Sequence, residues 1–485
     1  MLCRKLSIFT SLFNSCSSRT CPPPYPLPVR RTTHAHVRSS RQGHRRRRPR
    51  HRGCRLPGRG RHGVGSRRRG PRPVRCSVRA VEYFPESGAE GAYTQVSPNA
   101  PQRIAKARRG LTAAETTADG TVRALARTGH VDDRLDVVIV GDGYTADRQG
   151  DFREDAAARW ADVMAIEPYR SYQGLFNVWT VDAVSNESGI SGENGPSDVR
   201  DTALASYFWC ASTERLICTD LDKAESYAAK APDADLVIVV ANSAKYGGAG
   251  YFDLSNSLGY TGLSTLSSDN AQSSLIAAHE IAHSVGLLAD EYTYPGYASW
   301  PDAEPAEANA TVHDETQLRE KRAKWYRWLG EADPSGGTVG TYEGSYYHPL
   351  GIYRPTENSI MRALNTSHFN LPGREAMIAG FYREANLLTE LTPTAEPVRR
   401  GTALRVSLAA LTGDGLSAVR LRWYVDGVEV RKAAGRTHVV AAQLGVRPDG
   451  RAHTVTAKAT DATAAVRDPR TAEATSTSVS WTVRG

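Results

Sequence analysis

The alternation of apolar and polar positions is clearest in the middle of the chain. Residues 135–144 (LDVVIVGDGY) and 234–243 (ADLVIVVANS) are apolar runs, and the first ends in a glycine turn. Runs of this length, rich in β-branched residues, predict buried strands. Residues 176–184 alternate like a strand, residues 146–166 repeat like an amphipathic helix, and a helix-or-turn region starts at residue 201. The order strand, helix, strand, helix, strand predicts an α/β or α+β layer with a helix behind the sheet.

Further along the chain the pattern predicts two more helices and one uncertain strand. Residues 313–330 and 373–388 have helical patterns. Residues 245–268 are rich in glycine and serine, and we expect them to be largely irregular. Within them, residues 246–251 (YGGAGY) fit either a plain loop or an edge strand that could pair with an extended peptide substrate.

After Pro393 the chain changes to short alternating segments with the rhythm of β-strands. The Asp426–Gly427 pair lies inside one of them and is a hairpin signal. We therefore predict an antiparallel β-sandwich of immunoglobulin-like type over residues 391–485, on the basis of strand rhythm and the tryptophan at position 423. The predicted strand segments are 403–411, 420–430, 438–444, 453–460 and 476–484.

Charge is unevenly distributed along the sequence. Residues 1–81 hold 22 of the 61 Lys and Arg residues and no acid, so the formal net charge of +9 hides a remainder with 39 basic and 52 acidic residues. Residues 1–80 cannot bury enough apolar surface to fold and are predicted to be a disordered tail. Three interpretations stay open: a non-native product of a mis-set start or reading frame, a poor export signal that is processed, and a nucleic-acid-binding arm. Interleaved aromatic residues and a nucleic-acid module are both lacking, so we expect no nucleic-acid partner. Residues 81–125 are expected to form an ordered lead-in.

Only two of the seven cysteines lie outside the tail. Cys210 and Cys218 enclose a short loop, which suits a disulfide in an oxidising compartment, although two reduced buried thiols would give the same spacing. No apolar run approaches the roughly 18 residues that a membrane span needs, so we expect no transmembrane segment.

The sequence AAHEIAHSVGLLADEY, from Ala277 to Tyr292, carries the clearest chemistry. On a helix His279 and His283 lie on one face one turn apart, and two imidazoles at this spacing can hold one Zn²⁺. Glu280 lies beside them and can reach a water molecule at the metal as general base. The same spacing also occurs in ordinary helices, so the residues that follow decide the interpretation.

A catalytic zinc needs a third protein ligand, and the sequence offers two carboxylates for it. A continued helix would carry Asp290 about 10 Å beyond His283. A bend at Gly286 would bring it back, because glycine tolerates a sharp turn. Asp290 is therefore the predicted third ligand and Glu291 the fallback, and either could instead orient a histidine.

These residues resemble the zinc helix of the IgA-protease-like metallopeptidases, a family of metzincin-like zincins. Four further segments resemble the family in the same order: DRLDVVIVGDGYTADR, FWCASTERLIC, YRPTENSIMRALN and LPGREAMIAGFYR. The resemblance covers residues 82–390 and implies a zinc metallopeptidase with an α+β, zincin-like mixed sheet and an active-site helix over 126–390. It also implies a Met-turn that places Met361 beneath the metal.

The sequence departs from the stricter metzincin pattern at two positions. The third ligand would stand at Ala289, which cannot bind metal, and a Met-turn tyrosine would stand at Ala363. Three tyrosines could supply the missing oxyanion donor, and none has a specific claim: Tyr292, Tyr347 and Tyr353. His368 could replace the acid as a metal ligand, although a surface role suits it better.

We accordingly predict a secreted, monomeric, zinc-dependent endopeptidase that acts on protein or peptide substrates. Zinc is held by His279, His283 and Asp290, and Glu280 is the general base. Two alternatives stay open: a zinc amidase or deacylase that acts on cell-wall or small amides, and a non-catalytic binding protein on the same scaffold. Substrate specificity depends on loops that the sequence does not place.

Overall fold

The fold is described from a computed structural model of the chain, which describes residues 79–96, 109–251, 256–411 and 415–485. The basic tail that we predict over residues 1–80 lies almost wholly outside these residues. In the described part of the chain, none of the helices combines the length and the apolar character that a membrane crossing requires.

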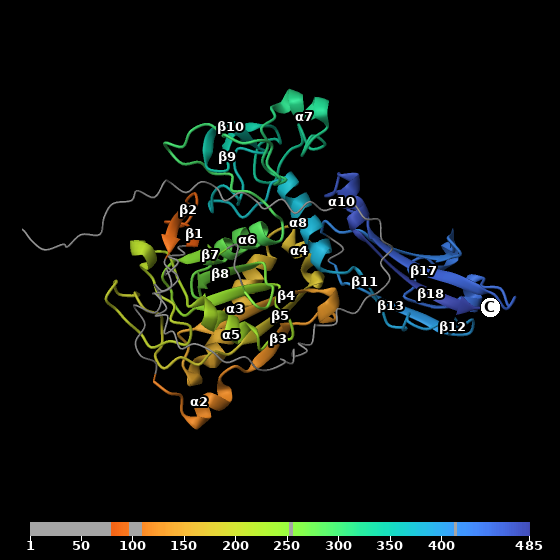
Figure 1. The fold of residues 1–485 in the computed structure, drawn as a ribbon, viewed down its shortest axis with the longest axis horizontal. Coiled ribbons are helices and arrows are strands. Elements are labelled where there is room, and N and C mark those ends of the chain that lie inside the picture. Colours follow the sequence, from red (N-terminus) through yellow and green to blue (C-terminus); the bar gives the residue numbers. More distant parts are fainter. Residues whose placement is uncertain (1–78, 97–108, 252–255, 412–414) are drawn as a thin grey trace, which may run out of the picture. The chain divides into compact units, whose positions relative to one another are not determined.

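A mixed eight-stranded sheet forms the centre of the protein, as the sequence predicts (Figure 1). Its order is β2-β1-β7-β8-β6-β4-β5-β3. The inner strands β8, β6, β4 and β5 are parallel, and β7 pairs antiparallel with β8. The strands are β1 (Arg79–Tyr83), β2 (Ala92–Val96), β3 (Val122–Ala126), β4 (Leu135–Asp142), β5 (Phe176–Val181), β6 (Leu236–Ala241), β7 (Gly248–Tyr251) and β8 (Gly262–Ser267).

Both faces of this sheet are covered, and the central strands β4, β5, β6 and β8 are buried at every position. Val137 and Ile139 of β4 pack with α3 (Gln149–Met164) and α6 (Ser273–Ser284). Val138 and Val140 of β4 pack on the opposite side with α5 (Leu221–Ala228). Strands covered on both faces are typical of parallel sheets.

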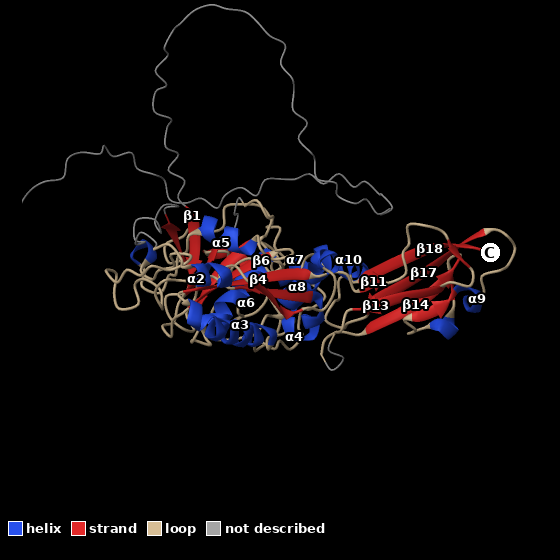
Figure 2. Cartoon of the chain, turned by 90° about the horizontal axis from the view of Figure 1, so that it is seen from below, coloured by secondary structure: helices blue, strands red, loops and turns tan. Residues whose placement is uncertain are grey.

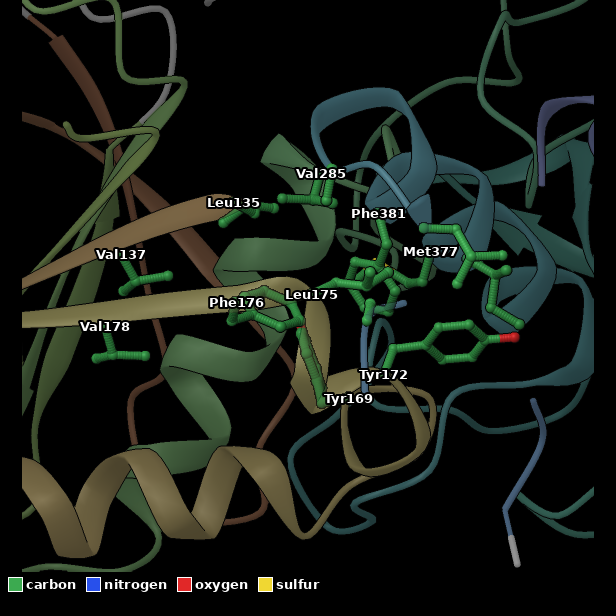
Figure 3. Packing of buried hydrophobic residues seen from close by; sticks show 14 of the residues in the cluster. Leu135, Val137, Tyr169, Tyr172, Leu175, Phe176, Val178, Val285, Met377 and Phe381 are labelled. Carbon is green, nitrogen blue, oxygen red and sulfur yellow. The ribbon is translucent and has the colours of Figure 1, made fainter. Parts of the chain in front are cut away.

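One end of the sheet continues into a cluster of aromatic and aliphatic side chains (Figure 3). Phe176 at the start of β5 lies against Phe381 of α8 (Leu371–Glu384), with ring centroids 5.2 Å apart. Tyr169 from α4 (Tyr169–Tyr172) joins them, and its hydroxyl donates to the Ala278 carbonyl of α6 at 2.8 Å. This hydrogen bond joins α6 to the aromatic cluster.

The structure corrects two sequence expectations in this region. Residues 313–330 do not form one helix: α7 (Glu315–Lys321) ends early, and Arg322 adopts a left-handed φ of 50°. The segment expected to be irregular contains β7 and the central strand β8. The glycine and serine content of this segment hides the apolar pattern by which a strand is recognised, although every residue of both strands is buried. The hairpin β9 (Tyr342–Ser345) and β10 (His348–Arg354), α2 (Ala113–Ala118) and α5 were also not foreseen.

The C-terminal part consists of two further sheets (Figure 2). One has the order β11-β13-β16 and the other β12-β18-β17-β14-β15. Asp426 and Gly427 both adopt positive φ between β14 and β15, which confirms the predicted hairpin turn. Residues 441–444 are helical rather than extended. The elements are β11 (Leu388–Glu390), β12 (Val398–Arg399), β13 (Ala403–Leu408), β14 (Val419–Val425), β15 (Val428–Glu429), β16 (His438–Val440), α9 (Ala441–Leu444), β17 (Ala452–Asp461), α10 (Pro469–Ala474) and β18 (Ser476–Arg484).

A continuous hydrophobic core joins the C-terminal sheets to the central one. It runs from Leu135 through Phe381 to the stacked pair Trp423 and Trp481, whose ring centroids are 5.7 Å apart. The predicted boundary near residue 390 therefore divides a shared core, and β11 already belongs to the C-terminal sheet before that boundary. The immunoglobulin-like classification of these sheets stays a prediction.

Candidate metal centre

The helix α6 carries His279, Glu280 and His283 and is buried along most of its length. Its sequence contains neither glycine nor proline and is rich in alanine, which favours a helix. Ala277 and Ile281 pack into the hydrophobic core. The two histidines therefore project from one side of a helix whose other side is fixed by packing.

The chain turns back immediately after α6, at the predicted place. The left-handed residue of the turn is Leu287, with φ of 50°, rather than Gly286. Gly286 is needed for a different reason: a Cβ there would collide with the Met377 sulfur and the Ala282 carbonyl. The amide of Leu288 donates to the same Ala282 carbonyl at 3.2 Å. This return brings Asp290 back beside both histidines.

Four side chains converge so closely that they could hold one metal ion. Among the described residues, His279, His283, Asp290 and Glu82 each offer a ligand atom, and these atoms lie within 4.8 Å of one another. The Asp290 Oδ1 is 3.2 Å from His279 Nε2 and 3.3 Å from His283 Nε2. The Glu82 oxygens lie 3.4 Å from each of the same nitrogens. In a tetrahedral zinc site with bonds of about 2.0–2.2 Å, ligand atoms lie about 3.3–3.6 Å apart, so the spacing fits.

The hydrogen bonds of the two imidazoles support the same conclusion. The Nδ1–H of His279 donates to the Ile360 carbonyl at 2.9 Å, and that of His283 donates to the Leu288 carbonyl at 2.7 Å. In its neutral form each ring directs the lone pair of Nε2 towards the centre, where the two Nε2 atoms are 2.9 Å apart. Two lone pairs at this distance repel unless a cation lies between them. Such backbone contacts are typical of metal-binding histidines.

The electrostatics of the site favour positive charge at its centre. Burial alone would lower the pKa of His279, but the carboxylates of Glu82 and Asp290 raise it to about 10. Burial alone would raise the pKa of Asp290, but His283 and His279 hold it well below its usual range. A cation bound at the centre would satisfy both carboxylates and displace the protons from the histidines.

Glu82 is the member of this group that the sequence analysis missed. It belongs to β1, is fully buried, and precedes the zinc-helix motif by nearly 200 residues. It is the first acidic residue of the chain, but no spacing relates it to the histidines. Only the pairing of β1 with β7, which sets Glu82 opposite Gly250, brings it to the site.

A layer of tyrosines surrounds the two carboxylates. The Tyr347 hydroxyl donates to Asp290 Oδ2 at 2.6 Å, and that of Tyr292 donates to Glu82 Oε1 at 2.7 Å. The Tyr93 hydroxyl lies 3.1 Å from Glu82 Oε2 and 3.3 Å from Asp290 Oδ2. Burial and the two carboxylates raise the pKa of all three tyrosines, so they remain protonated donors.

Two other residues considered from the sequence lie in different surroundings. Tyr353 is part of β10, where its backbone bridges to Thr311, and its side chain is half-buried. His368 is exposed, and its carbonyl accepts from the Ile360 amide. Neither residue is among the four side chains that could hold a metal ion.

Glu291, the fallback ligand, faces away from the histidines into a separate network. Its carboxylate accepts from Ser359 Oγ at 2.6 Å and from the side-chain amides of Asn309 and Asn370, each at 2.9 Å. Its backbone amide donates to the Met361 carbonyl at 2.8 Å. Glu291 thus fastens the loop after α6 to the segment that contains Met361.

Met361 is buried and lies directly after Ile360, the residue whose carbonyl receives the His279 hydrogen bond. Its amide donates to Ser359 Oγ at 3.1 Å, within the network of Glu291. The methionine segment therefore supports the orientation of a histidine through the backbone of its neighbour.

Glu280 is buried beside the metal group, and neither carboxylate oxygen has a hydrogen-bond partner among the described residues. Its carboxylate lies directly beneath Gly250 of β7, where a Cβ would collide with it. A small cavity of about 10 Å³ adjoins it, lined in part by Tyr251, Ser264 and Ser284. Burial and the nearby Glu82 raise the pKa of Glu280 well above its usual range.

The structure joins Cys210 and Cys218 in a disulfide, as the spacing favours. Tyr207 and Cys218 form two backbone hydrogen bonds across the enclosed loop. This loop contacts β7 through the Gly248 amide, which donates to the Arg215 carbonyl at 3.1 Å. The disulfide therefore stabilises a segment that lies against the strand above Glu280.

The comparison with known families agrees with the site. The sequence profile of the IgA peptidase M64 family matches residues 123–336 and 329–381, more than half of the chain and all of α6. No curated protein matches the chain. The matched region contains both histidines, Glu280, Asp290 and Met361, whereas Glu82 precedes it. The chain belongs to the IgA peptidase M64 family.

Proposed function

We propose that this protein is a secreted zinc endopeptidase whose metal is bound by His279, His283 and Asp290. The observation that carries the proposal is the convergence of three ligand atoms, which lie 2.9, 3.2 and 3.3 Å from one another, with both Nδ1 atoms engaged by backbone carbonyls. Nitrogen and carboxylate ligands in this number are typical of catalytic zinc. Zinc, when bound, supplies the Lewis acidity that activates water and polarises a peptide carbonyl.

Glu280 is proposed as the general base. Its carboxylate is buried next to the metal ligands and has no hydrogen-bond partner among the described residues. A buried carboxylate without partners is costly unless it serves a ligand or a reaction. From this position one carboxylate oxygen can take the proton of the attacking water and deliver it to the leaving amide nitrogen.

Tyr347 is proposed as the donor to the oxyanion. Its hydroxyl contacts the Asp290 carboxylate, and its ring stacks on Tyr294 with centroids 5.6 Å apart. In this position it orients Asp290 and can also donate to negative charge that develops on a peptide carbonyl. Tyr292 instead donates to Glu82 and is fully buried, which makes it a supporting residue.

The proposed location outside the cell is supported by the disulfide between Cys210 and Cys218, because such bonds persist in oxidising compartments. The C-terminal sheets are proposed to buttress the catalytic part. Tyr172 and Tyr382, on the catalytic side, both donate to Asp461 at the end of β17, at 2.6 and 3.0 Å.

The proposal is tested by measuring zinc content and casein cleavage in the wild type and in Glu280→Ala. We expect about one zinc per chain in both proteins and loss of cleavage in the variant, because Glu280 is no ligand. Bound zinc without cleavage of any protein or peptide, but with hydrolysis of small amides, would favour an amidase. Loss of zinc in Glu280→Ala would contradict its assignment as base.

A further inference from the structure

The metal group of this protein is closed, although a zinc peptidase needs an open position. Catalytic zinc sites combine three protein ligands with one position for water or substrate. In this protein the carboxylate of Glu82 lies 3.4 Å from both histidine nitrogens, where it would hold a bound metal as a fourth ligand. His279, Glu82, Asp290 and Glu280 are all at least 96% buried. His283 keeps 12% side-chain exposure, but the Glu82 carboxylate takes the position that a peptide carbonyl would need.

The segment that closes the site is the β1–β2 hairpin, residues 79–96 (Figure 1). β1 adds to the sheet by antiparallel pairing with β7, and Glu82 lies opposite Gly250. Extended peptides bind to many proteins by this kind of strand addition. Gly250 covers the Glu280 carboxylate, so a peptide paired with β7 in place of β1 would run past both Glu280 and the metal group.

The hairpin is held in place by contacts of the residues that follow Glu82. The Phe84 ring packs edge-on against the His279 imidazole, with centroids 5.0 Å apart. Beyond it, the Leu364 amide donates to the Ala89 carbonyl at 3.1 Å, and Arg362 forms an ion pair with Glu90 at 3.3 Å. These contacts connect the hairpin to the methionine segment and to a metal ligand, so its detachment would open the whole site.

We propose that residues 79–96 are an internal, substrate-like inhibitor of this peptidase, and that Glu82 occupies the coordination position that catalysis requires. The inference rests on the proposed function, since it presupposes a catalytic metal. His279, His283 and Asp290 all come from residues 279–290 and stay together when the hairpin leaves. Wild-type activity is then limited by the fraction of molecules whose hairpin is detached from β7.

The inference is tested on the full chain with Co²⁺ at the metal site, using the visible spectrum to follow binding of acetohydroxamate. The variant is Glu82→Ala. The matched control is Glu86→Ala, which removes an exposed carboxylate from the same hairpin. We expect Glu82→Ala to keep one Co²⁺ and to bind acetohydroxamate at least about tenfold more tightly than wild type. Glu86→Ala should behave as wild type.

A second variant separates ligation from hairpin docking. Phe84→Ala keeps Glu82 but removes the ring that packs on His279, and it should also increase acetohydroxamate affinity. Hydrogen exchange of the amides in residues 79–96 should become faster in both variants but stay slow in Glu86→Ala. These readouts remain available if either variant is inactive or less stable.

Two results would overturn the inference. Loss of Co²⁺ from Glu82→Ala would make Glu82 a permanent ligand, and unchanged acetohydroxamate affinity in both variants would show that the hairpin does not block the metal. Casein cleavage distinguishes this failure from failure of the proposed function. If wild type cleaves casein through Glu280 while ligand access is unchanged in Glu82→Ala, only the inhibitory role is wrong.

Discussion

Replacement of Glu291 tests which of the two carboxylates offered by the sequence, Asp290 or Glu291, is the third metal ligand. Glu291 is fully buried, and its carboxylate accepts hydrogen bonds from Ser359, Asn309 and Asn370. Glu291→Ala leaves these donors without an acceptor, at about 1–3 kcal/mol each. We therefore expect the free energy of unfolding to fall by about 3–9 kcal/mol. Glu291→Gln keeps one acceptor oxygen and should cost about 1–2 kcal/mol.

Replacement of Glu291 should affect zinc affinity much less than replacement of Asp290. Chemical denaturation measures the stability, and competition with a chromophoric chelator measures zinc affinity in the same samples. Glu291→Gln should bind zinc within about tenfold of wild type, because Glu291 contacts no metal ligand atom. Asp290→Asn should lose at least about 100-fold, more than the usual effect of a residue behind the ligands. A larger loss of zinc affinity in Glu291→Gln than in Asp290→Asn would refute the assignment.

Three further predictions concern the surroundings of the site. The pKa of His279 is raised to about 10 in the metal-free protein, so zinc must displace a proton when it binds. The apparent zinc affinity should therefore rise with pH, which chelator competition from pH 6 to pH 8 measures. The same raised pKa stabilises the folded, metal-free protein. This stabilisation is complete below the unfolded pKa of about 6.5 and disappears as the pH rises towards 10, so the thermal unfolding temperature measured in the presence of chelator should fall over this range. Tyr347→Phe removes the hydrogen bond to Asp290 and should reduce zinc affinity about 10- to 100-fold; an unchanged affinity would contradict the role of Tyr347 in orienting Asp290. The double variant Cys210→Ser/Cys218→Ser opens a loop with a sequence separation of 8 and should reduce the free energy of unfolding by about 2–3 kcal/mol, whereas reductant should no longer affect its stability.

The sequence predicts those parts of the site that are determined by local spacing. His279 and His283 follow from the helical period, and Asp290 follows from the length of the turn after α6. The details of that turn could not be predicted, because it depends on packing: the missing Cβ of Gly286 makes room for Met377, which lies about 90 residues further on. The left-handed conformation falls on Leu287, a residue with no intrinsic preference for it.

Glu82 could not be predicted because its position depends on strand order. A sequence pattern can indicate a strand over residues 79–83, but it does not specify that this strand pairs with β7 rather than with another edge. The same limit applies to β7 itself, whose glycines read equally well as a loop. Those glycines are required where the Glu280 carboxylate and the Ile276 side chain approach the strand. Apolar strands such as β4 and β6 were predictable because burial on both faces demands a continuous apolar run.

The central claim is that this protein hydrolyses peptide bonds with one bound zinc. The most direct test removes the metal with a chelator, dialyses the chelator away, and then measures casein cleavage while zinc is returned in steps. We predict that cleavage disappears with the metal and returns in proportion to added zinc, up to a break at one equivalent per chain. Cleavage that persists in the metal-free protein, or that does not return with zinc, would contradict the claim.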